Sequence, residues 1–274
     1  MSGYTYAGEV TSSYNEARVT PLSTDRQIAI ETSVRVTPSV PTFRYWDYWG
    51  TLVDAFDLHG AHDELSVIGE SLVDTSSPEA EVPAAGWDDL RRPGHQGEFA
   101  EFLAPTTYVP SLARMEDLGD VVASLAASGP PSVAVEAAVD WVRSRLDYTK
   151  GSTDVTTTAA DALRGGTGVC QDFAHLTLAV LRSLGIPARY VSGYLYPASA
   201  AGVGTTATGE SHAWVEAWTG AWWGMDPTDG GRVGERHVIV GRGRDYADVT
   251  PLKGIYHGAP AKALTVSVEL SRVA

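Results

Sequence analysis

The chain has 274 residues, of which 43% are apolar and 9% aromatic, so it can bury a core without disulfide staples. Its 34 acidic and 20 basic residues give a formal net charge of −14, which disfavours nucleic acid and anionic membranes as partners. The chain has a single cysteine, no stretch near the roughly 18 apolar residues of a membrane span, and no recognisable secretion signal. These features predict a cytoplasmic protein.

The first hundred residues are predicted to form β structure. Residues 27–36 alternate apolar and polar side chains, a pattern that buries one face of a strand. The apolar positions of this strand are Ile28, Ile30, Val34 and Val36. Similar strands are expected to begin at Tyr4 and Leu65, and the Pro-, Gly- and Ala-rich segment 76–97 is typical of a surface connection. The sequence therefore predicts a β-rich N-terminal domain over residues 1–107.

Residues 108–274 are predicted to form a second domain of the α+β class, with helices first and strands later. Apolar residues recur at helical spacing over 131–146 and again over 170–184, where Gly185 follows as a helix stop. Strands are expected after that helix, over residues 189–196, 212–217, 221–226, 237–240 and 264–270.

The only cysteine lies at the predicted start of the second helix. Cys170 follows the glycine-rich segment 165–168 and should occupy the first helical turn. There the unpaired backbone N–H groups and the positive end of the helix dipole favour a thiolate and could receive an oxyanion. An inert buried cysteine would fit the same position, so the hypothesis of a nucleophile requires a base nearby.

His212 is the histidine best placed to be that base. Segments 212–217 and 221–226 read as two strands joined through a three-residue loop, Trp218 to Gly220, which fixes their pairing. In that register His212 lies opposite Asp226, so the two side chains share a face and can meet. The same register sets Ala217 opposite Ala221, Glu216 opposite Trp222, Val215 opposite Trp223 and Trp214 opposite Gly224. An ordinary surface His–Asp pair is the alternative.

The other histidines do not suggest a second site. His175 lies five residues after Cys170, about 140° round the helix, so it should point elsewhere. His59 and His62 lack a third ligand and a helical pattern. The sequence therefore predicts no metal site and no cofactor.

The segments that carry these residues resemble the core of the transglutaminase-like superfamily. They read GVCQDFAHLTLAVLRSLGIPARYVSGYLYP, SHAWVEAW and GMDPTD. Three further segments resemble the bacterial branch, which has a β-rich N-terminal domain: YNEARVTP, DYWGTLVDAFDLHGAHDELSV and GRDYADVTPLKGIYHG. The resemblance implies a papain-like α+β core and a catalytic triad that maps onto Cys170, His212 and Asp226.

The resemblance also implies a reaction. It is thiol-dependent acyl transfer on the amide of a peptide or protein, through a thioester at Cys170 that a primary amine or water resolves. A cysteine peptidase or amidase, and a non-catalytic binding module with the same fold, remain as alternatives. Gln171 stands where relatives often have arginine, and the calcium loops of the animal enzymes have no clear counterpart here.

Two further residues are expected to line the substrate site. Trp214 lies two residues beyond His212 on the same strand face and is expected to line the acyl channel; simple packing over Gly224 is the alternative. Asp172, in the first turn of the Cys170 helix, is the second expected lining residue, and it could instead cap that helix.

Overall fold

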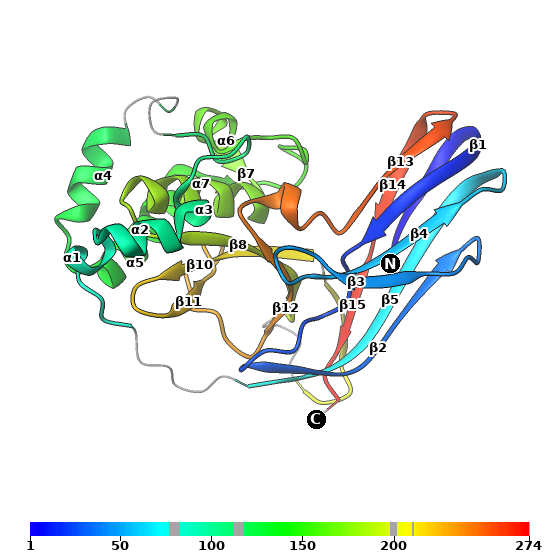
Figure 1. The fold of residues 1–274 in the computed structure, drawn as a ribbon, viewed down its shortest axis with the longest axis horizontal. Helices are drawn as coiled ribbons and strands as arrows, with labels where there is room; N and C mark the ends of the chain where they lie inside the picture. The colour runs from blue at the N-terminus through cyan, green and yellow to red at the C-terminus, as the bar shows by residue number, and fades with distance from the viewer. Residues whose placement is uncertain (77–82, 112–114, 116–117, 198–201, 210, 274) are drawn as a thin grey trace.

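The structure is a computed structural model that describes residues 1–273 except 77–82, 112–114, 116–117, 198–201 and 210. Figure 1 shows two parts side by side: helices packed on a small sheet, and a curled sheet of long strands. The α+β fold class predicted from the sequence is confirmed. Within the described residues, none of the helices is both long enough and apolar enough to cross a membrane.

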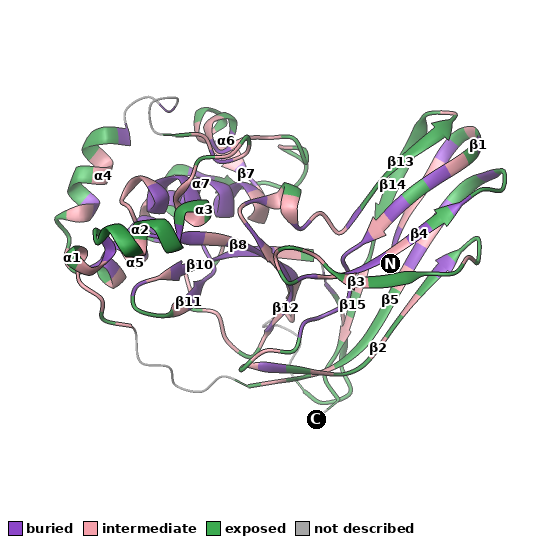
Figure 2. Ribbon diagram, in the orientation of Figure 1, coloured by how far each residue is buried: buried purple, intermediate pink, exposed green. Residues whose placement is uncertain are grey.

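The curled sheet is antiparallel, with strand order β2-β5-β1-β4-β3, and two strands from the end of the chain also pair with β1. Its strands are β1 (Ser2–Ala17), β2 (Gln27–Thr37), β3 (Phe43–Trp46), β4 (Leu52–Leu58), β5 (His62–Thr75), β13 (Leu252–Gly258) and β14 (Ala261–Val266). The long strands are exposed over much of their length (Figure 2), and their buried side chains form a separate core.

The predicted division into residues 1–107 and 108–274 is wrong, because each predicted domain contains elements that belong to the other part of the molecule. Strands β13 and β14 return to β1, so the end of the chain completes the first sheet. The helices α1 (Trp87–Leu90) and α2 (Pro93–Glu98) begin within the predicted surface connection 76–97, and α3 (Ala100–Leu103) follows it. Leu90 is buried in the core of the helical part. Strand pairing between distant segments is non-local, and residue spacing does not encode it.

Strand β2 forms as predicted, but part of the face predicted to be buried is exposed. Ile28 and Ile30 are each 57% exposed, whereas Gln27 is buried. The pairing of β2 with β5 shifts between Ala29 and Glu31, which breaks the alternation. Gln27 instead joins the two parts of the molecule, because its amide donates to the Ile239 carbonyl at 2.8 Å and accepts from the Ile239 N–H at 2.7 Å.

The helical part is built around α7 (Cys170–Ser183), which is surrounded by α4 (Leu118–Ala126), α5 (Pro131–Arg145) and α6 (Ala159–Gly165). α7 packs on an antiparallel sheet of order β11-β10-β8-β12. Its strands are β8 (Ala188–Leu195), β10 (Ser211–Trp218), β11 (Trp222–Met225) and β12 (His237–Gly243). Residues 172–182 are all buried (Figure 2), so α7 is the central element of this core and not an amphipathic surface helix.

The remaining elements are short. They are β6 (Asp147–Tyr148), β7 (Thr167–Gly168), β9 (Thr206–Gly209), the 3-10 helix η2 (Tyr246–Asp248) and β15 (Val268–Ser271). The strand predicted over 264–270 is split at Ser267: β14 pairs with β1, and β15 pairs with β9. The pattern of alternation continues through both strands, so it could not reveal that they belong to different sheets.

The β10–β11 hairpin forms, but its register differs from the prediction by two residues. Trp218 pairs with Trp222 and Ala217 with Trp223, so the loop is Thr219, Gly220 and Ala221. Gly220 has φ +113°, and the Thr219 hydroxyl accepts the Trp223 indole N–H at 2.9 Å. Because the shift is even, every side chain stays on its predicted face. The proximity of His212 and Asp226 therefore survives the wrong register.

A buried carboxylate lies on the outer face of this sheet. Glu216 is 7% exposed, and Arg189 and Arg242 donate to it at 2.7 and 2.9 Å. Burial alone would raise the pKa of Glu216, but the two guanidinium groups lower it. The Arg189 guanidinium also lies 4.1 Å from the Trp222 ring centroid. The Glu216 carboxylate therefore offsets the repulsion between the Arg189 and Arg242 guanidinium groups.

We expect Glu216→Ala to lower the free energy of unfolding by about 3 kcal/mol, because it leaves two largely buried guanidinium groups without their counter-charge. The matched control is Glu136→Ala, which breaks an exposed pair with Arg232 at 2.8 Å and should cost about 1 kcal/mol or less. Urea unfolding of the three proteins measures both effects. Equal losses in the two variants would contradict this role of Glu216.

Candidate active site

Cys170 is the first residue of α7, as predicted. Val169 before it is extended, so the chain enters the helix directly from a strand-like segment. As the first helical residue, Cys170 has a backbone N–H with no partner inside the helix. The residue is partly exposed, makes no disulfide and lines a cavity. Cys170 thus faces a cavity and has a backbone N–H available as a donor.

Asp172 fixes the turn that leads into Cys170. One oxygen of its carboxylate accepts the Val169 N–H at 2.8 Å and the Thr153 hydroxyl at 2.7 Å. The side chain is 1% exposed, and burial raises its pKa. A Cβ on Gly168 would lie 2.7 Å from the Asp172 Cβ, so only glycine fits there. The prediction that Asp172 lines the substrate site is wrong: the residue is a helix cap.

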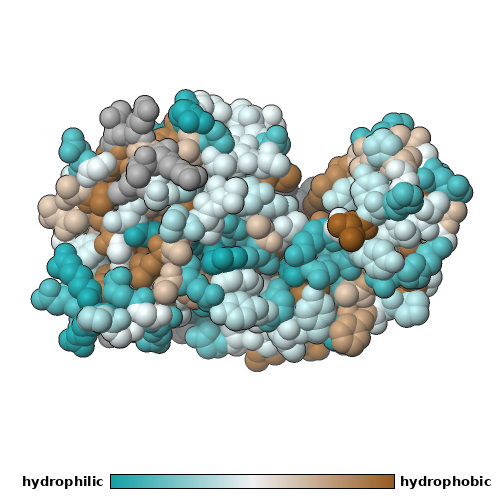
Figure 3. Space-filling model, turned by 45° about the horizontal axis from the view of Figure 1, so that its top comes forward, coloured by the Kyte–Doolittle hydropathy of each residue, from teal (hydrophilic) through white to brown (hydrophobic). Residues whose placement is uncertain are grey.

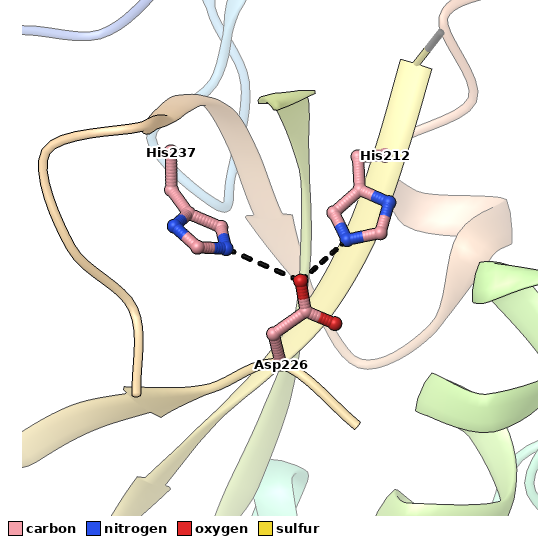
Figure 4. Close-up of side chains that lie close together, drawn as sticks. All are labelled: His212, Asp226 and His237. Carbon is pink, nitrogen blue, oxygen red and sulfur yellow. Dashed lines mark hydrogen bonds and ion pairs between the residues drawn. The ribbon is translucent and has the colours of Figure 1, made fainter. Parts of the chain in front are cut away.

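His212 and Asp226 meet, although they do not lie directly opposite each other. His212 is the second residue of β10, and Asp226 follows the last residue of β11. The His212 Nε2 lies 2.6 Å from the Asp226 Oδ2 (Figure 4), and the imidazole is 11% exposed. With Nε2 held by the carboxylate, Nδ1 is the nitrogen left to face the thiol. Cys170 and His212 line the same cavity.

A second histidine, which sequence reasoning missed, shares the same carboxylate. His237 Nε2 lies 3.2 Å from the Asp226 Oδ2, on the other side from His212 (Figure 4). The Gly234 N–H donates to His237 Nδ1 at 3.2 Å, which assigns the His237 proton to Nε2, facing Asp226. The Thr228 N–H donates to the other Asp226 oxygen at 2.9 Å. Asp226 is therefore held by three donors.

Trp214 does not line the acyl channel as predicted. It is 0% exposed and packs with Leu22, Val191 and Ile239. Its ring packs near both imidazoles, with its centroid 6.1 Å from that of His212 and 5.2 Å from that of His237. The alternative, packing over Gly224, is also wrong.

Glycine does make room for Trp214, but on the other neighbouring strand. A Cβ on Gly193 of β8 would overlap the Val238 carbonyl oxygen of β12 and lie 2.6 Å from the edge of the Trp214 ring, whereas Gly224 is covered by Val233. Gly193 therefore allows both the close approach of β12 and the packing of Trp214.

The electrostatics of the pair favour a charged imidazole. Burial alone would lower the pKa of His212, but the hydrogen bond to Asp226 and the neighbouring Cys170 thiol raise it to about 10. Burial alone would raise the pKa of Asp226, but hydrogen bonds from His212 and His237 bring it well below its usual range. At neutral pH the arrangement therefore holds an imidazolium against a carboxylate. An imidazolium beside a cysteine favours the thiolate.

This pair should make stability depend on pH. Because His212 binds its proton more tightly in the folded protein, its contribution is complete below about pH 6.5 and is lost as the pH rises toward about 10. We expect the difference in urea midpoint between the wild type and His212→Gln to shrink over that range. A difference that stays constant or grows with pH would contradict the raised pKa of His212.

The two imidazoles and the carboxylate also have the composition of a metal site. Their ligand atoms lie within 4.8 Å of one another, and no other such cluster of three occurs among the residues that the structure describes. However, the N···O distances of 2.6 and 3.2 Å are direct hydrogen bonds, which a zinc ion about 2.0 to 2.1 Å from each ligand would have to replace. The donor set is better explained as an oriented base than as a metal centre.

A cavity of about 480 Å³ opens onto Cys170 and His212. One wall comes from β8 and the start of α7, and the other from the curled sheet, through residues such as Val67, Leu264 and Val266. The surface is also hollowed between the two parts of the molecule (Figure 3). Most of the lining side chains are aliphatic or tyrosine. The first sheet therefore takes part in forming the site.

Comparisons with known proteins show the family of the chain. The model of the transglutaminase-like superfamily matches residues 120–227, which include Cys170, His212 and Asp226, and the bacterial transglutaminase-like N-terminal region matches residues 1–74. An uncharacterised protein of Mycobacterium leprae is 50% identical over 273 residues, which cover 100% of this chain and 97% of that protein. The chain belongs to the transglutaminase-like superfamily.

Further relatives are consistent with this membership. An uncharacterised protein of Mycobacterium tuberculosis is 34% identical, over 97% of this chain and 89% of its own length. A crystal structure named "Putative Cysteine Protease from Cytophaga hutchinsonii" superposes with a TM-score of 0.74 at 26% identity, over 98% of this chain and 88% of that one. Both the transglutaminase-like family and this neighbour indicate thiol-dependent chemistry at amide bonds, and therefore an enzyme.

Proposed function

We propose that this transglutaminase-like protein transfers an acyl group from an amide to Cys170, and from there to a primary amine or water. The observation that carries the proposal is the 2.6 Å contact between His212 Nε2 and Asp226 at a cavity that Cys170 also lines. The substrate is the amide of a peptide or protein. The roles assigned are nucleophile for Cys170, general acid and base for His212, and orienting carboxylate for Asp226.

The reaction has two halves. In the first, the Cys170 sulfur attacks the amide carbonyl carbon while His212 holds the proton of the thiol. The tetrahedral intermediate collapses as His212 gives that proton to the leaving amine, which departs and leaves a thioester. In the second half, an amine or water gives a proton to His212 and attacks the thioester. The sulfur leaves, and a new amide or a carboxylic acid is released.

Hydrolysis of a peptide or isopeptide bond is the second candidate. The similar structure from Cytophaga hutchinsonii is named a cysteine protease, which favours this candidate. A binding module without activity is disfavoured, since an oriented imidazole beside an accessible thiol is unnecessary for binding alone. Acyl transfer and hydrolysis differ in whether an amine or water resolves the thioester. A binding module would form no thioester.

The deciding experiment incubates the protein with glutamine-containing peptides and a labelled primary amine, and follows three signals. Incorporation of the amine supports transfer, new peptide N-termini support a peptidase, and ammonia without incorporation supports an amidase. Cys170→Ala is the control. Signals that persist unchanged in that variant, or the absence of all three in the wild type, would count against the proposal.

The single cysteine also bears on where the enzyme works. A catalytic thiol must stay reduced, and a chain without disulfides suits a reducing compartment. We propose the cytoplasm, and fractionation of the cells that make the protein tests this.

A further inference from the structure

The wall of the cavity formed by β8 carries hydroxyl groups. Alternate residues of this strand, Tyr190, Ser192 and Tyr194, all line the cavity. The Tyr194 hydroxyl donates to the Val19 carbonyl at 3.1 Å. The Tyr190 hydroxyl, in contrast, makes no hydrogen bond to any described residue. Tyr190 as a whole is 2% exposed, but its oxygen is not among the fully enclosed polar atoms, so the hydroxyl borders the cavity. A tyrosine hydroxyl that borders a cavity and has no protein partner is free to donate to a group that binds there.

The ring of Tyr190 is fixed beside the helix that carries the nucleophile. Tyr190 pairs with Val215 across β8 and β10, on the face that packs against α7. The ring centroid lies 5.1 Å from that of His175, a fully buried residue of α7. Tyr108 packs on the same imidazole, with a centroid distance of 5.1 Å. The Tyr190 hydroxyl therefore reaches the cavity from a rigid support.

A tetrahedral intermediate formed at Cys170 requires hydrogen-bond donors in the cavity. Attack on a carbonyl carbon moves an electron pair onto the carbonyl oxygen, which then needs two donors. The Cys170 N–H supplies one donor by its position at the start of α7. The second must be a hydroxyl or N–H that faces the same space and has no other partner.

We propose that the Tyr190 hydroxyl is the second oxyanion donor of this site, which makes Tyr190 a catalytic residue. The assignment rests on the proposed acyl transfer. Burial, together with the neighbouring Cys170, raises the pKa of Tyr190 well above its usual value, so the hydroxyl keeps its proton as it donates.

The test compares two reactions of the same sulfur. Acylation by p-nitrophenyl acetate passes through a tetrahedral oxyanion, which collapses to a thioester and p-nitrophenolate. Alkylation by iodoacetamide displaces iodide and forms no oxyanion. We expect Tyr190→Phe to slow acylation about 10²-fold and to leave alkylation unchanged. Because the hydroxyl has no partner in the resting protein, the urea midpoint should also be unchanged.

Tyr108→Phe is the matched control, since Tyr108 packs on the same His175 ring and does not line the cavity. It should leave both rates as in the wild type. Unchanged acylation in Tyr190→Phe, equal losses of acylation and alkylation, or a loss that appears in Ser192→Ala instead would each overturn the assignment. A wild type that is alkylated but never acylated would contradict the proposed function itself.

Discussion

Replacing Cys170 with alanine is expected to abolish amide turnover, with a loss of about 10⁵-fold or more in kcat/KM. The chain contains no other cysteine, so no second thiol can take over the attack. The remaining His212–Asp226 pair could still act on a water molecule, but without a covalent intermediate the reaction loses its first step. The loss is measured with the amide substrate found in the incorporation assay.

The serine variant separates loss of the thiol from loss of packing. Cys170→Ser keeps nearly the same shape, and it should be as inactive as the alanine variant, because a serine hydroxyl is a weaker nucleophile than a thiol in a site of this kind. Both variants should unfold at the urea concentration of the wild type, since the Cys170 side chain is only partly buried. Turnover within tenfold of the wild type in either variant would refute the role of Cys170.

Asp226→Asn is expected to lower kcat by about 10³- to 10⁴-fold while leaving KM nearly unchanged. The carboxylate holds the His212 tautomer and stabilises the imidazolium, and the uncharged amide does neither. Removing its charge should also lower the pKa of His212 from about 10, so the basic limb of the pH–rate profile should move to lower pH. The profile thus separates an electrostatic role from a structural one.

The matched control for this variant is Asp229→Asn. Asp229 lies three residues further on. Its side chain is 45% exposed and lies 3.7 Å from Arg236, outside the cavity lining. It should leave kcat and the pH profile unchanged. Equal activity in the two variants, or a loss in Asp226→Asn without any shift of the basic limb, would be inconsistent with a carboxylate that orients His212.

The chemistry-bearing residues of the candidate site could be predicted because they lie in local patterns. The glycine-rich segment and helical stripe located Cys170 at a helix start, and the short hairpin brought His212 to Asp226. The prediction tolerated an error of two residues in the hairpin register, because strand faces repeat with that period. A one-residue error would have separated the pair.

The missed features all depend on contacts between distant segments. His237 reaches Asp226 because β12 lies beside β8 in the sheet, an order that local patterns of residues do not reveal. Trp214 was predicted to line the channel from its face alone, but Gly193 on the neighbouring strand lets it pack inside the protein. The same limitation explains the return of β13 and β14 to the first sheet.

The most direct test of the account is the rate at which iodoacetamide alkylates Cys170 at about pH 6, where an unassisted thiol is almost wholly protonated. If His212, held by Asp226, activates the sulfur, the wild type should react at least about tenfold faster than His212→Ala, with Asp226→Asn between them. Equal rates in all three proteins would mean that the imidazole does not act on the thiol, and the proposed catalytic site would be wrong.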